Sequence, residues 1–499
     1  MTELSKIFFR NRIFLLVLLI NIIALIATLS NTYTDGYNLR QAQTAIMSRN
    51  IFYDNFNIFP TRLTFFAPSE GQIIFEFPFI HFLTALTYKI FPISEINGRI
   101  INLFLYVFNG ILFFRIQKII FTHNISILTS SLFISSPLIL YLGHAYMPET
   151  SMMTFYLLSY YFFIKNKKEK NIIYEYLMFI SLALAPLLKP PAGIIYLPIF
   201  LDYLNRLNIG SLLKRILLFL FCTLPLFIWM LYANTINSSA LSSGSNYGDW
   251  INLLFGPGSI FNFWVDLQFY KNILSYFILQ HLNPITFIFS ILAIFSTFKS
   301  KDNLHIFHRN WILMNLLFLF IFAGANNGHP YYQIYFMPPL LYFIGIFFSN
   351  SKGLFMKKNK FINLTILLNI ILCISVFIYG SNEKLRISNI DEFKSVYAKN
   401  IIIDKNIPSE FILYSHDGLA STAVYTYYGD SYSKQFSLGE DDITNLQNEI
   451  SLGAKYIFFI NTNYGDTLKK LKENKKTLNW LKSKTKIYES NSMILYKLN

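Results

Sequence analysis

Long apolar runs separated by short polar segments form the main pattern of the chain. Several runs reach the roughly 20 residues that an α-helix needs to span a bilayer. They lack the alternation of a membrane β-barrel. The pattern predicts about eleven transmembrane helices, at approximately residues 13–31, 96–114, 122–141, 150–164, 172–188, 191–205, 212–232, 278–298, 311–325, 333–349 and 361–380. The expected fold class is an α-helical polytopic membrane protein.

Composition agrees with this fold class. Of the 499 residues, 54% are hydrophobic and 14% are charged, whereas about 25% of the residues in a typical soluble domain are charged. Cys222 and Cys373 both lie inside apolar runs, so we expect neither a disulfide framework nor a cysteine metal motif.

The positions of the basic residues exclude nucleic acid as the expected partner and set a topology. Despite a net charge of +15, Lys and Arg fall in short clusters between apolar runs. The clusters are Lys6/Arg10/Arg12, Arg115/Lys118, Lys165/Lys167/Lys168/Lys170, Arg206/Lys214/Arg215, Lys299/Lys301/Arg309 and Lys352/Lys357/Lys358/Lys360. Such clusters mark cytosolic loops, and residues 142–149, 233–270 and 325–333 are nearly free of them. The alternation predicts a cytosolic N-terminus and a C-terminus on the outer face.

The first apolar run, residues 13–30, is longer than the apolar part of a typical signal peptide, and no cleavage site of small residues follows it. We therefore expect a retained signal-anchor helix.

Two large outer regions follow from the topology. The first comprises residues 32–95 and contains the stretch FEFPFIHFLTALTYKIF. If this stretch spanned the membrane, every later loop would lie on the opposite side of the membrane. We therefore predict that it forms a helix along the outer interface.

The second outer region is predicted to be a small α/β domain at residues 381–499, after a membrane domain at residues 1–380. The segments 411–415 and 456–460 are typical of buried strands, whereas ITNLQNEISLG and DTLKKLKENKKTLNWLK are typical of helices. The SHDG sequence at 415–418 is interpreted as a turn after a strand, with a catalytic role of His416 or Asp417 as the less favoured alternative.

With this topology, a set of polar residues from different loops lies where the helices meet the outer face of the membrane. The set consists of Asp35, Tyr37, Arg40, Glu70, Glu76, His144, Glu149, Lys189, His329, Tyr331 and Tyr332. Any one of these residues could be an ordinary solvated side chain, but convergence of the whole set is typical of a functional site.

Each candidate has two interpretations. Asp35 either closes a turn before a helix or accepts a proton from an acceptor hydroxyl. Glu76 and Glu149 either place negative charge at helix starts or take part in the chemistry. Lys189 either extends toward the interface or binds a phosphate, and local spacing leaves Arg40 and Gln41 open between substrate contact and loop packing.

The segment NNGHPYYQIYFMPP contains His329, Tyr331 and Tyr332. These three side chains either belong to an interfacial aromatic belt or donate hydrogen bonds to a lipid phosphate. A divalent metal stays open as a cofactor, with Glu76 and His329 as candidate ligands, although the usual two-histidine spacing is missing.

The order of these motifs resembles the GT-C superfamily of polytopic glycosyltransferases, in the branch of the protein O-mannosyltransferases and the lipid A aminoarabinose transferases. The matching segments, which span roughly residues 10 to 350, are TDGYNLRQAQTA, FEFPFIHFLTALTYKIFPISEINGRIINLF, GHAYMPE, LKPPAGIIYLP and GHPYYQIYFMPP. One departure is Phe77, where the aminoarabinose transferases have Lys, and it shifts the expected phosphate contact to Lys189, Arg40 or His329.

The resemblance implies a GT-C fold and a sugar donor linked to a polyprenyl phosphate, used on the periplasmic face of a bacterial inner membrane. It implies that Asp35 is the general base, with Glu76 and Glu149 as supporting acidic residues in the donor or metal region. It also implies that Lys189, His329, Tyr331 and Tyr332 lie near the lipid phosphate.

We therefore expect an inverting glycosyltransferase that acts on a cell-envelope acceptor, which could be a glycan, lipid A or a protein. The absence of a Gly-rich phosphate-binding loop agrees with a donor that is not a nucleotide. The alternative is a flippase or transporter of a lipid-linked sugar.

Overall fold

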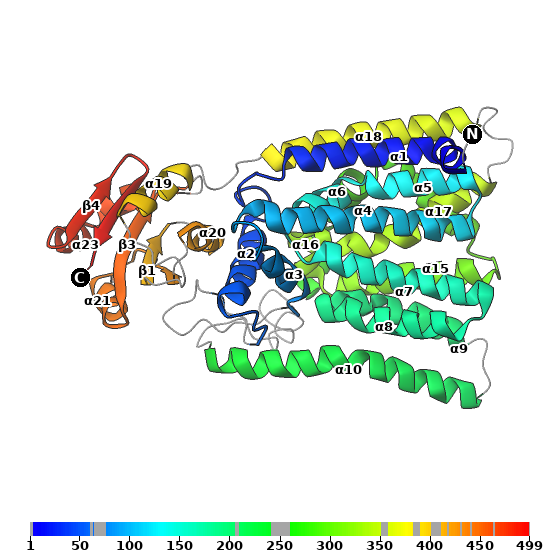
Figure 1. The fold of residues 1–499 in the computed structure, drawn as a ribbon, viewed down its shortest axis with the longest axis horizontal. Helices are drawn as coiled ribbons and strands as arrows, with labels where there is room; N and C mark the ends of the chain where they lie inside the picture. The colour runs from blue at the N-terminus through cyan, green and yellow to red at the C-terminus, as the bar shows by residue number, and fades with distance from the viewer. Residues whose placement is uncertain are drawn as a thin grey trace.

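The computed structural model describes residues 3–59, 63, 76–204, 209–240, 260–350, 358–382, 390–400, 411–416, 419–429, 432–439, 442–462 and 465–498. Glu70 and Asp417 lie outside these residues. The molecule consists of a bundle of long helices and a smaller domain that holds a five-stranded sheet (Figure 1).

The long helices of the bundle lie side by side, and α2 and α3 lie at one end of it (Figure 1). The helical elements of this part are α1 (Glu3–Ala27), α2 (Asn38–Tyr53), α3 (Phe79–Thr87), α4 (Glu95–Ile120), α5 (His123–Ile134), α6 (Pro137–His144), α7 (Glu149–Glu169), α8 (Ile172–Leu188), η2 (Pro190–Ile195), α9 (Tyr196–Leu204), α10 (Ile209–Ala240), α12 (Ile260–Val265), α13 (Leu267–Ser275), η4 (Tyr276–His281), α14 (Pro284–Ser296), α15 (Asn303–Ile321), α16 (Ala323–Gly328), η5 (Pro330–Phe336), α17 (Met337–Asn350) and α18 (Lys358–Asn382).

The chain is a multi-pass membrane protein. Within the described residues, four helices are long and apolar enough to cross a bilayer, or up to six if each of two bent pairs counts as one span. A helical segment occupies each of the eleven regions expected from the sequence, and the number that crosses the membrane stays a prediction. The outward-facing apolar side chains of α10, such as Leu220 and Phe221, are 61% and 70% exposed, which suits contact with lipid.

Two expected spans are bent in the structure, and the sharper bend lies in the span expected at 278–298. The sequence predicts a single helix at 278–298, but the segments Leu267–His281 and Pro284–Ser296 are bent by 108°. The break falls at Leu282 and Asn283, because Pro284 disfavours helical backbone at the residue before it. The Asn283 side chain then accepts a hydrogen bond from the Thr286 backbone N–H and caps α14.

A proline produces a second break, between α5 and α6, which are bent by 55°. Pro137 begins α6, and the Asn369 side chain donates hydrogen bonds to the Ser135 carbonyl at 2.8 Å and to its hydroxyl at 2.7 Å. This contact satisfies a carbonyl that the broken helix leaves without its usual partner.

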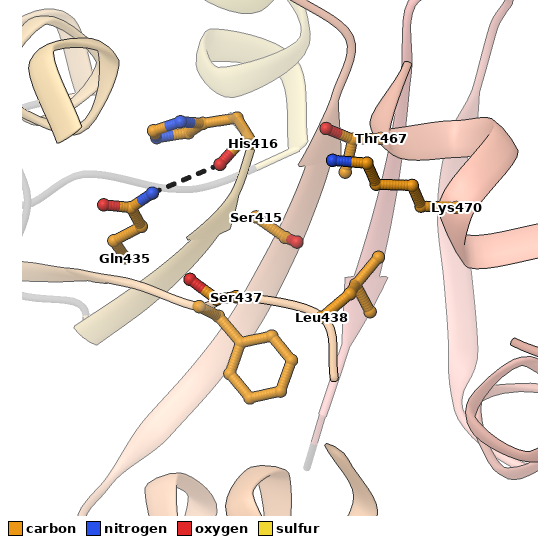
Figure 2. A pocket seen from close by; sticks show the side chains of 8 residues that line it. Ser415, His416, Gln435, Ser437, Leu438, Thr467 and Lys470 are labelled. Atoms are coloured by element: carbon orange, nitrogen blue, oxygen red, sulfur yellow. Dashed lines mark hydrogen bonds between the residues drawn. The ribbon is translucent and has the colours of Figure 1, made fainter. Parts of the chain in front are cut away.

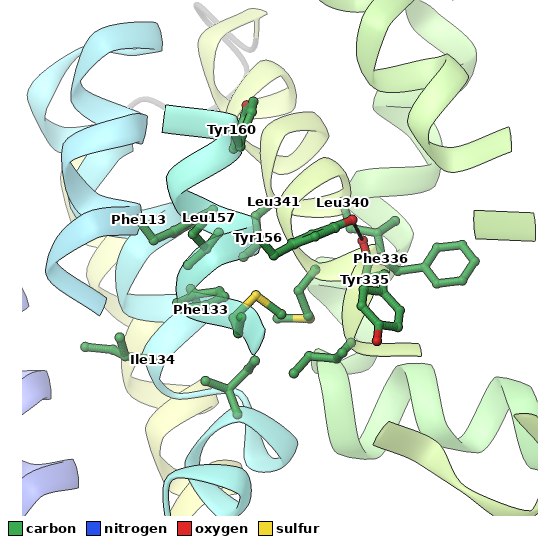
Figure 3. Packing of buried hydrophobic residues seen from close by; sticks show 14 of the residues in the cluster. Phe113, Phe133, Ile134, Tyr156, Leu157, Tyr160, Tyr335, Phe336, Leu340 and Leu341 are labelled. Atoms are coloured by element: carbon green, nitrogen blue, oxygen red, sulfur yellow. Dashed lines mark hydrogen bonds between the residues drawn. The ribbon is translucent and has the colours of Figure 1, made fainter. Parts of the chain in front are cut away.

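The core of the bundle contains interlocked aromatic and aliphatic side chains from helices far apart in the sequence (Figure 3). Phe113 stacks on Phe133 with ring centroids 4.4 Å apart. Tyr156 is fully buried, and its hydroxyl accepts a hydrogen bond from the Trp311 indole at 2.7 Å. Buried tyrosine and tryptophan are tolerated there because their polar atoms have partners.

The smaller domain contains a mixed sheet with strand order β2-β1-β3-β5-β4. Its elements are α19 (Ile390–Asn400), β1 (Phe411–Ser415), α20 (Leu419–Gly429), β2 (Tyr432–Gln435), α21 (Asp442–Ser451), β3 (Ala454–Ile460), α22 (Thr467–Glu473), α23 (Lys475–Leu481), β4 (Thr485–Glu489) and β5 (Met493–Lys497). Strands β2, β1 and β3 are parallel, whereas β5 is antiparallel to β3 and β4. The strands and helices expected in this region are confirmed.

This domain packs on α2 through α20, which lies between the sheet and the bundle (Figure 1). One continuous hydrophobic core joins them, and it contains Ile46 of α2, Tyr425 of α20 and Phe458 of β3. Polar contacts add to it, because Arg49 donates to the Tyr427 carbonyl at 2.6 Å and the Tyr33 backbone N–H donates to the Tyr428 hydroxyl at 2.9 Å. The loop that precedes α2 and the last turns of α2 therefore both contact α20.

Candidate active site

The α7–α8 hairpin brings two of the expected site residues together. The two helices pack on each other and are connected by Lys170 and Asn171, so the start of α7 and the end of α8 lie at the same end of the bundle. Glu149 is the first residue of α7, and Lys189 follows α8, where Pro190 forces it into extended backbone. The Lys189 ammonium lies 2.9 Å from the Glu149 carboxylate.

Four side chains from different elements form a chain of alternating charge, which we call the ion chain: Arg40, Glu76, Lys189 and Glu149. The Glu76 carboxylate accepts a hydrogen bond from the Arg40 guanidinium and lies 2.8 Å from the Lys189 ammonium, which also contacts Glu149. Because two cations alternate with two carboxylates, the ion chain is close to neutral as a whole.

Burial strengthens the electrostatic interactions among the four side chains of the ion chain. Burial raises the pKa of the Glu76 carboxyl, but Arg40 and Lys189 outweigh burial and hold this pKa well below its ordinary value. Burial lowers the pKa of the Lys189 ammonium, whereas Glu149 and Glu76 raise it, so that it lies well above its ordinary value. Glu76 and Lys189 therefore stay charged at neutral pH, which requires that each keeps its partner.

The aromatic segment that begins η5 lies beside the ion chain. The Lys189 ammonium is 5.7 Å from the centre of the Tyr331 ring, within the range of a cation–π contact. The Tyr331 ring stacks on His329 and packs against Tyr332. Burial lowers the pKa of the His329 imidazole, and Arg40 and Lys189 lower it further, so that this ring is neutral at pH 7.

Asp35 lies in a second buried cluster with Gln41, Arg99 and His144. One carboxylate oxygen accepts a hydrogen bond from the Gln41 amide at 2.5 Å. The other lies 2.5 Å from His144 Nε2 and 3.3 Å from the Arg99 guanidinium. Asp35 is 6% exposed, and Arg99 and His144 are 0% and 1% exposed. The 2.5 Å contact between His144 and Asp35 requires a proton between the two groups.

One face of α4 holds the Asp35 cluster in place. The Arg99 guanidinium donates to the Thr28 carbonyl at 3.2 Å, at the end of α1, as well as to Asp35. Three residues later, the Asn102 amide donates to carbonyls of the loop between α6 and α7, including that of Met147. Residues three apart in a helix share a face, so α4 fixes both the loop of Asp35 and the loop that follows His144.

Tyr37 joins the Asp35 cluster to the ion chain. Its ring packs edge-on against Tyr141, on the side of the Asp35 cluster, and against Tyr331, on the side of the ion chain. Tyr37 has φ +55° just before α2, a left-handed conformation that is uncommon outside Gly and Asn and that is frequent at functional sites. An α-helix turns about 100° per residue. The adjacent residues Arg40 and Gln41 of α2 therefore point in different directions, Arg40 to Glu76 and Gln41 to Asp35.

The described residues do not fit a divalent metal at Glu76 and His329. The Glu76 carboxylate is already paired with Arg40 and Lys189, and two cations at that point disfavour a third. No group of three His, Cys, Asp or Glu side chains suited to a metal ion occurs among the residues that the structure describes.

The structure brings most of the expected residues together. Arg40, Glu76, Glu149 and Lys189 form the ion chain, and Tyr331 touches it, with His329 and Tyr332 packed beside Tyr331.

Arg99 was not among the residues expected from the sequence, and the partners of His144 and Gln41 could not be assigned from it. An ionised residue in the first turns of an apolar span, as in INGRIINLF, was the available signal for Arg99.

Comparisons with solved structures agree on the fold. ArnT from Cupriavidus metallidurans in the apo state matches with a TM-score of 0.62 at 12% identity, over 97% of this chain and 97% of that chain. The same protein bound to undecaprenyl phosphate gives a TM-score of 0.60 at 12% identity, with the same coverage. The Archaeoglobus fulgidus oligosaccharyltransferase, in complex with Zn and sulfate, gives 0.60 at 12% identity over 89% of this chain and 67% of that chain.

The chain therefore shares the fold of these solved proteins. The family model described as dolichyl-phosphate-mannose-protein mannosyltransferase matches residues 76–232, which include Glu76, Glu149 and Lys189. Residues 76–232 are thus similar to this family, and the chain as a whole has the fold of ArnT. Among curated protein sequences, none matches the chain.

Proposed function

We propose that the protein transfers a sugar from a polyprenyl-phosphate donor to a hydroxyl of a cell-envelope acceptor, with inversion at the anomeric carbon. Asp35 is the general base in this proposal. Arg40 and Lys189 contact the donor phosphate, with His329, Tyr331 and Tyr332 beside them. The observation that carries the proposal is the arrangement of the Asp35 cluster and the ion chain on either side of Tyr37.

Asp35 has the orientation and the open acceptor position that a base needs. Gln41, His144 and Arg99 fix the carboxylate through hydrogen bonds. Among the described residues, Oδ1 accepts a hydrogen bond only from Gln41, and a carboxylate oxygen has two lone pairs. The second lone pair of Oδ1 can accept the proton of an acceptor hydroxyl.

The bond changes follow from this placement. The acceptor oxygen forms a bond to the anomeric carbon from the side opposite the phosphate, and its proton passes to Asp35. The bond between the anomeric carbon and the phosphate oxygen breaks, and the polyprenyl phosphate leaves with the electron pair. Positioned cations beside the leaving oxygen stabilise the charge that develops there.

The ion chain suits a phosphate because its cations stay charged. The Lys189 ammonium has three N–H donors, and its contacts to Glu76 and Glu149 are ion pairs at 2.8 and 2.9 Å. Neither oxygen of Glu149 accepts a hydrogen bond from a described residue, so Lys189 can donate to a phosphate while both ion pairs remain. Glu76 and Glu149 then act as supporting residues that hold Lys189 in position.

The expected topology also determines the location that we propose for the protein. We propose that the membrane domain, residues 1–380, lies in a bacterial inner membrane with its N-terminus in the cytosol. The site then opens to the periplasm, and the domain at residues 381–499 lies outside as well. The structure supports this placement because the basic side chains Lys167 and Arg215 line one cavity together, at the end of α7 opposite Glu149.

A transfer assay tests the proposed function. Purified protein is reconstituted in liposomes with a radiolabelled sugar on undecaprenyl phosphate and with an envelope glycan fraction as acceptor. Label should move covalently to the acceptor fraction and leave undecaprenyl phosphate behind. Movement of the intact lipid-linked sugar across the bilayer, with no covalent product, would contradict the proposal and support a flippase.

A further inference from the structure

The sheet of the smaller domain has a topological switch point. After β1 the chain passes through α20 to β2 on one side, and after β2 it passes through α21 to β3 on the other side of β1. The two connections leave the carboxyl ends of the parallel strands in opposite directions. In α/β sheets of this kind, ligands bind in the crevice that such a divergence opens.

A cavity of about 270 Å³ lies at this edge. Ser415 at the end of β1 and Gln435 at the end of β2 line it, together with residues that follow these strands and residues of α22. Figure 2 shows the Lys470 side chain reaching from α22 into the cavity beside Thr467, toward Ser415. The cavity thus coincides with the place where the fold predicts a ligand.

The lining of the cavity is rich in hydrogen-bond donors. Its described lining residues are Ser415, His416, Gln435, Phe436, Ser437, Leu438, Thr467 and Lys470, and no acidic side chain is among them. The Gln435 amide donates to the His416 carbonyl at 3.2 Å (Figure 2), and the His416 ring contacts the Thr422 hydroxyl of α20 at 2.9 Å. Two side chains of the lining are therefore held in fixed orientations.

Thr467 provides a second, independent indication of a ligand. It is 3% exposed, and its hydroxyl has no hydrogen-bond partner among the described residues. A buried hydroxyl without a partner is unfavourable, and this one lines the cavity next to Lys470. A ligand oxygen in the cavity would satisfy it.

We propose that this cavity binds a small sugar that bears an anionic group, a phosphate or a carboxylate. The Lys470 ammonium contacts the anionic group, and the hydroxyls of Ser415, Ser437 and Thr467 contact the sugar hydroxyls. This site belongs to the smaller domain, and it is separate from the Asp35 cluster and the ion chain. It requires no transfer reaction, so its test does not depend on the proposed function.

Calorimetric titration of the purified full-length protein tests the proposal with glucose 1-phosphate, glucuronate and glucose as probes. The two anionic probes distinguish a phosphate from a carboxylate, and glucose controls for the sugar ring. We expect at least one anionic probe to bind and glucose to bind more weakly. Lys470→Gln should weaken that binding by about tenfold, which equals about 1.4 kcal/mol.

Lys469→Gln is the matched control, because Lys469 is the exposed neighbour on α22 and does not line the cavity. It should bind the anionic probe as the unmodified protein does. The proposal is overturned if neither anion binds, if glucose binds as tightly as both anions, or if Lys470→Gln and Lys469→Gln have the same affinity. Thr467→Val, which keeps the side-chain volume, should also weaken binding.

Discussion

The ion chain makes a quantitative prediction for Lys189→Met. Methionine keeps the unbranched length of the side chain but removes the cation between Glu76 and Glu149. Glu76 still has Arg40 as a partner, whereas Glu149, which is 1% exposed, loses the one cation that contacts it among the described residues. Breaking a buried pair in this way typically costs about 3–5 kcal/mol, because one buried charge is left uncompensated.

The expected loss can be measured as a melting temperature in detergent. For a membrane domain of this length the size scaling gives roughly 1–2 °C per kcal/mol, so we expect a decrease of roughly 3–10 °C. Lys165→Met is the matched control on the same helical hairpin. The pair of Lys165 with Glu169 is exposed to solvent, and its loss should leave the melting temperature unchanged.

A double-mutant cycle isolates the pair. Glu149→Gln should cost less than Lys189→Met, because Lys189 keeps Glu76 as a partner. The double variant Lys189→Met/Glu149→Gln should be more stable than the sum of the two single costs predicts, by about 1 kcal/mol or more. If the two costs add within about 0.5 kcal/mol, Lys189 and Glu149 do not interact and the description of the ion chain is wrong.

Two further predictions concern the elements around the site. A methyl group at Gly98 would lie 2.5 Å from the Tyr146 ring, so Gly98→Ala should destabilise the protein by about 1–3 kcal/mol, and an unchanged melting temperature would contradict that packing. Burial lowers the pKa of His81 to about 4, below its unfolded value of about 6.5. Because the unfolded chain binds this proton first, stability should fall as pH decreases from about 6.5 to about 4, by roughly 3 kcal/mol from this group. His81→Gln should remove that part of the loss in melting curves taken across this pH range, and a variant with the same pH profile as the unmodified protein would show that His81 is not buried in its neutral form.

The sequence predicted the elements better than their breaks. Apolar runs of about 20 residues locate helices because the bilayer demands that length, and the alternation of FILYS and YIFFI with polar segments located β1 and β3. The 108° bend before Pro284 was not predicted, because the apolar run continues through it and a proline is equally compatible with the first turn of a helix. Length and hydropathy alone cannot distinguish one continuous helix from two helices that meet at a bend.

The sequence predicted the members of the site better than their contacts. Lys189 and Glu149 could be assigned to one membrane face from the loop charges, but their pairing depends on how α7 and α8 pack. Arg99 contacts the carboxylate of Asp35, which lies 64 positions earlier in the chain, and no local sequence pattern indicates such a contact. Gln41 stayed undecided because its role depends on the direction in which α2 leaves Tyr37.

The central claim is that Asp35 accepts the proton of the acceptor hydroxyl, and Asp35→Asn tests it most directly. Asparagine keeps the size of the side chain and the contact with Gln41 but cannot accept that proton. General-base catalysis contributes typically about 10²–10⁴-fold, so the rate of sugar transfer at saturating donor should fall by that factor. Binding of the undecaprenyl-phosphate sugar should stay close to that of the control Asp54→Asn, at the other end of α2, whereas the melting temperature should fall because the buried Arg99 loses the carboxylate that it contacts. A variant Asp35→Asn that transfers sugar at the unmodified rate would contradict the account.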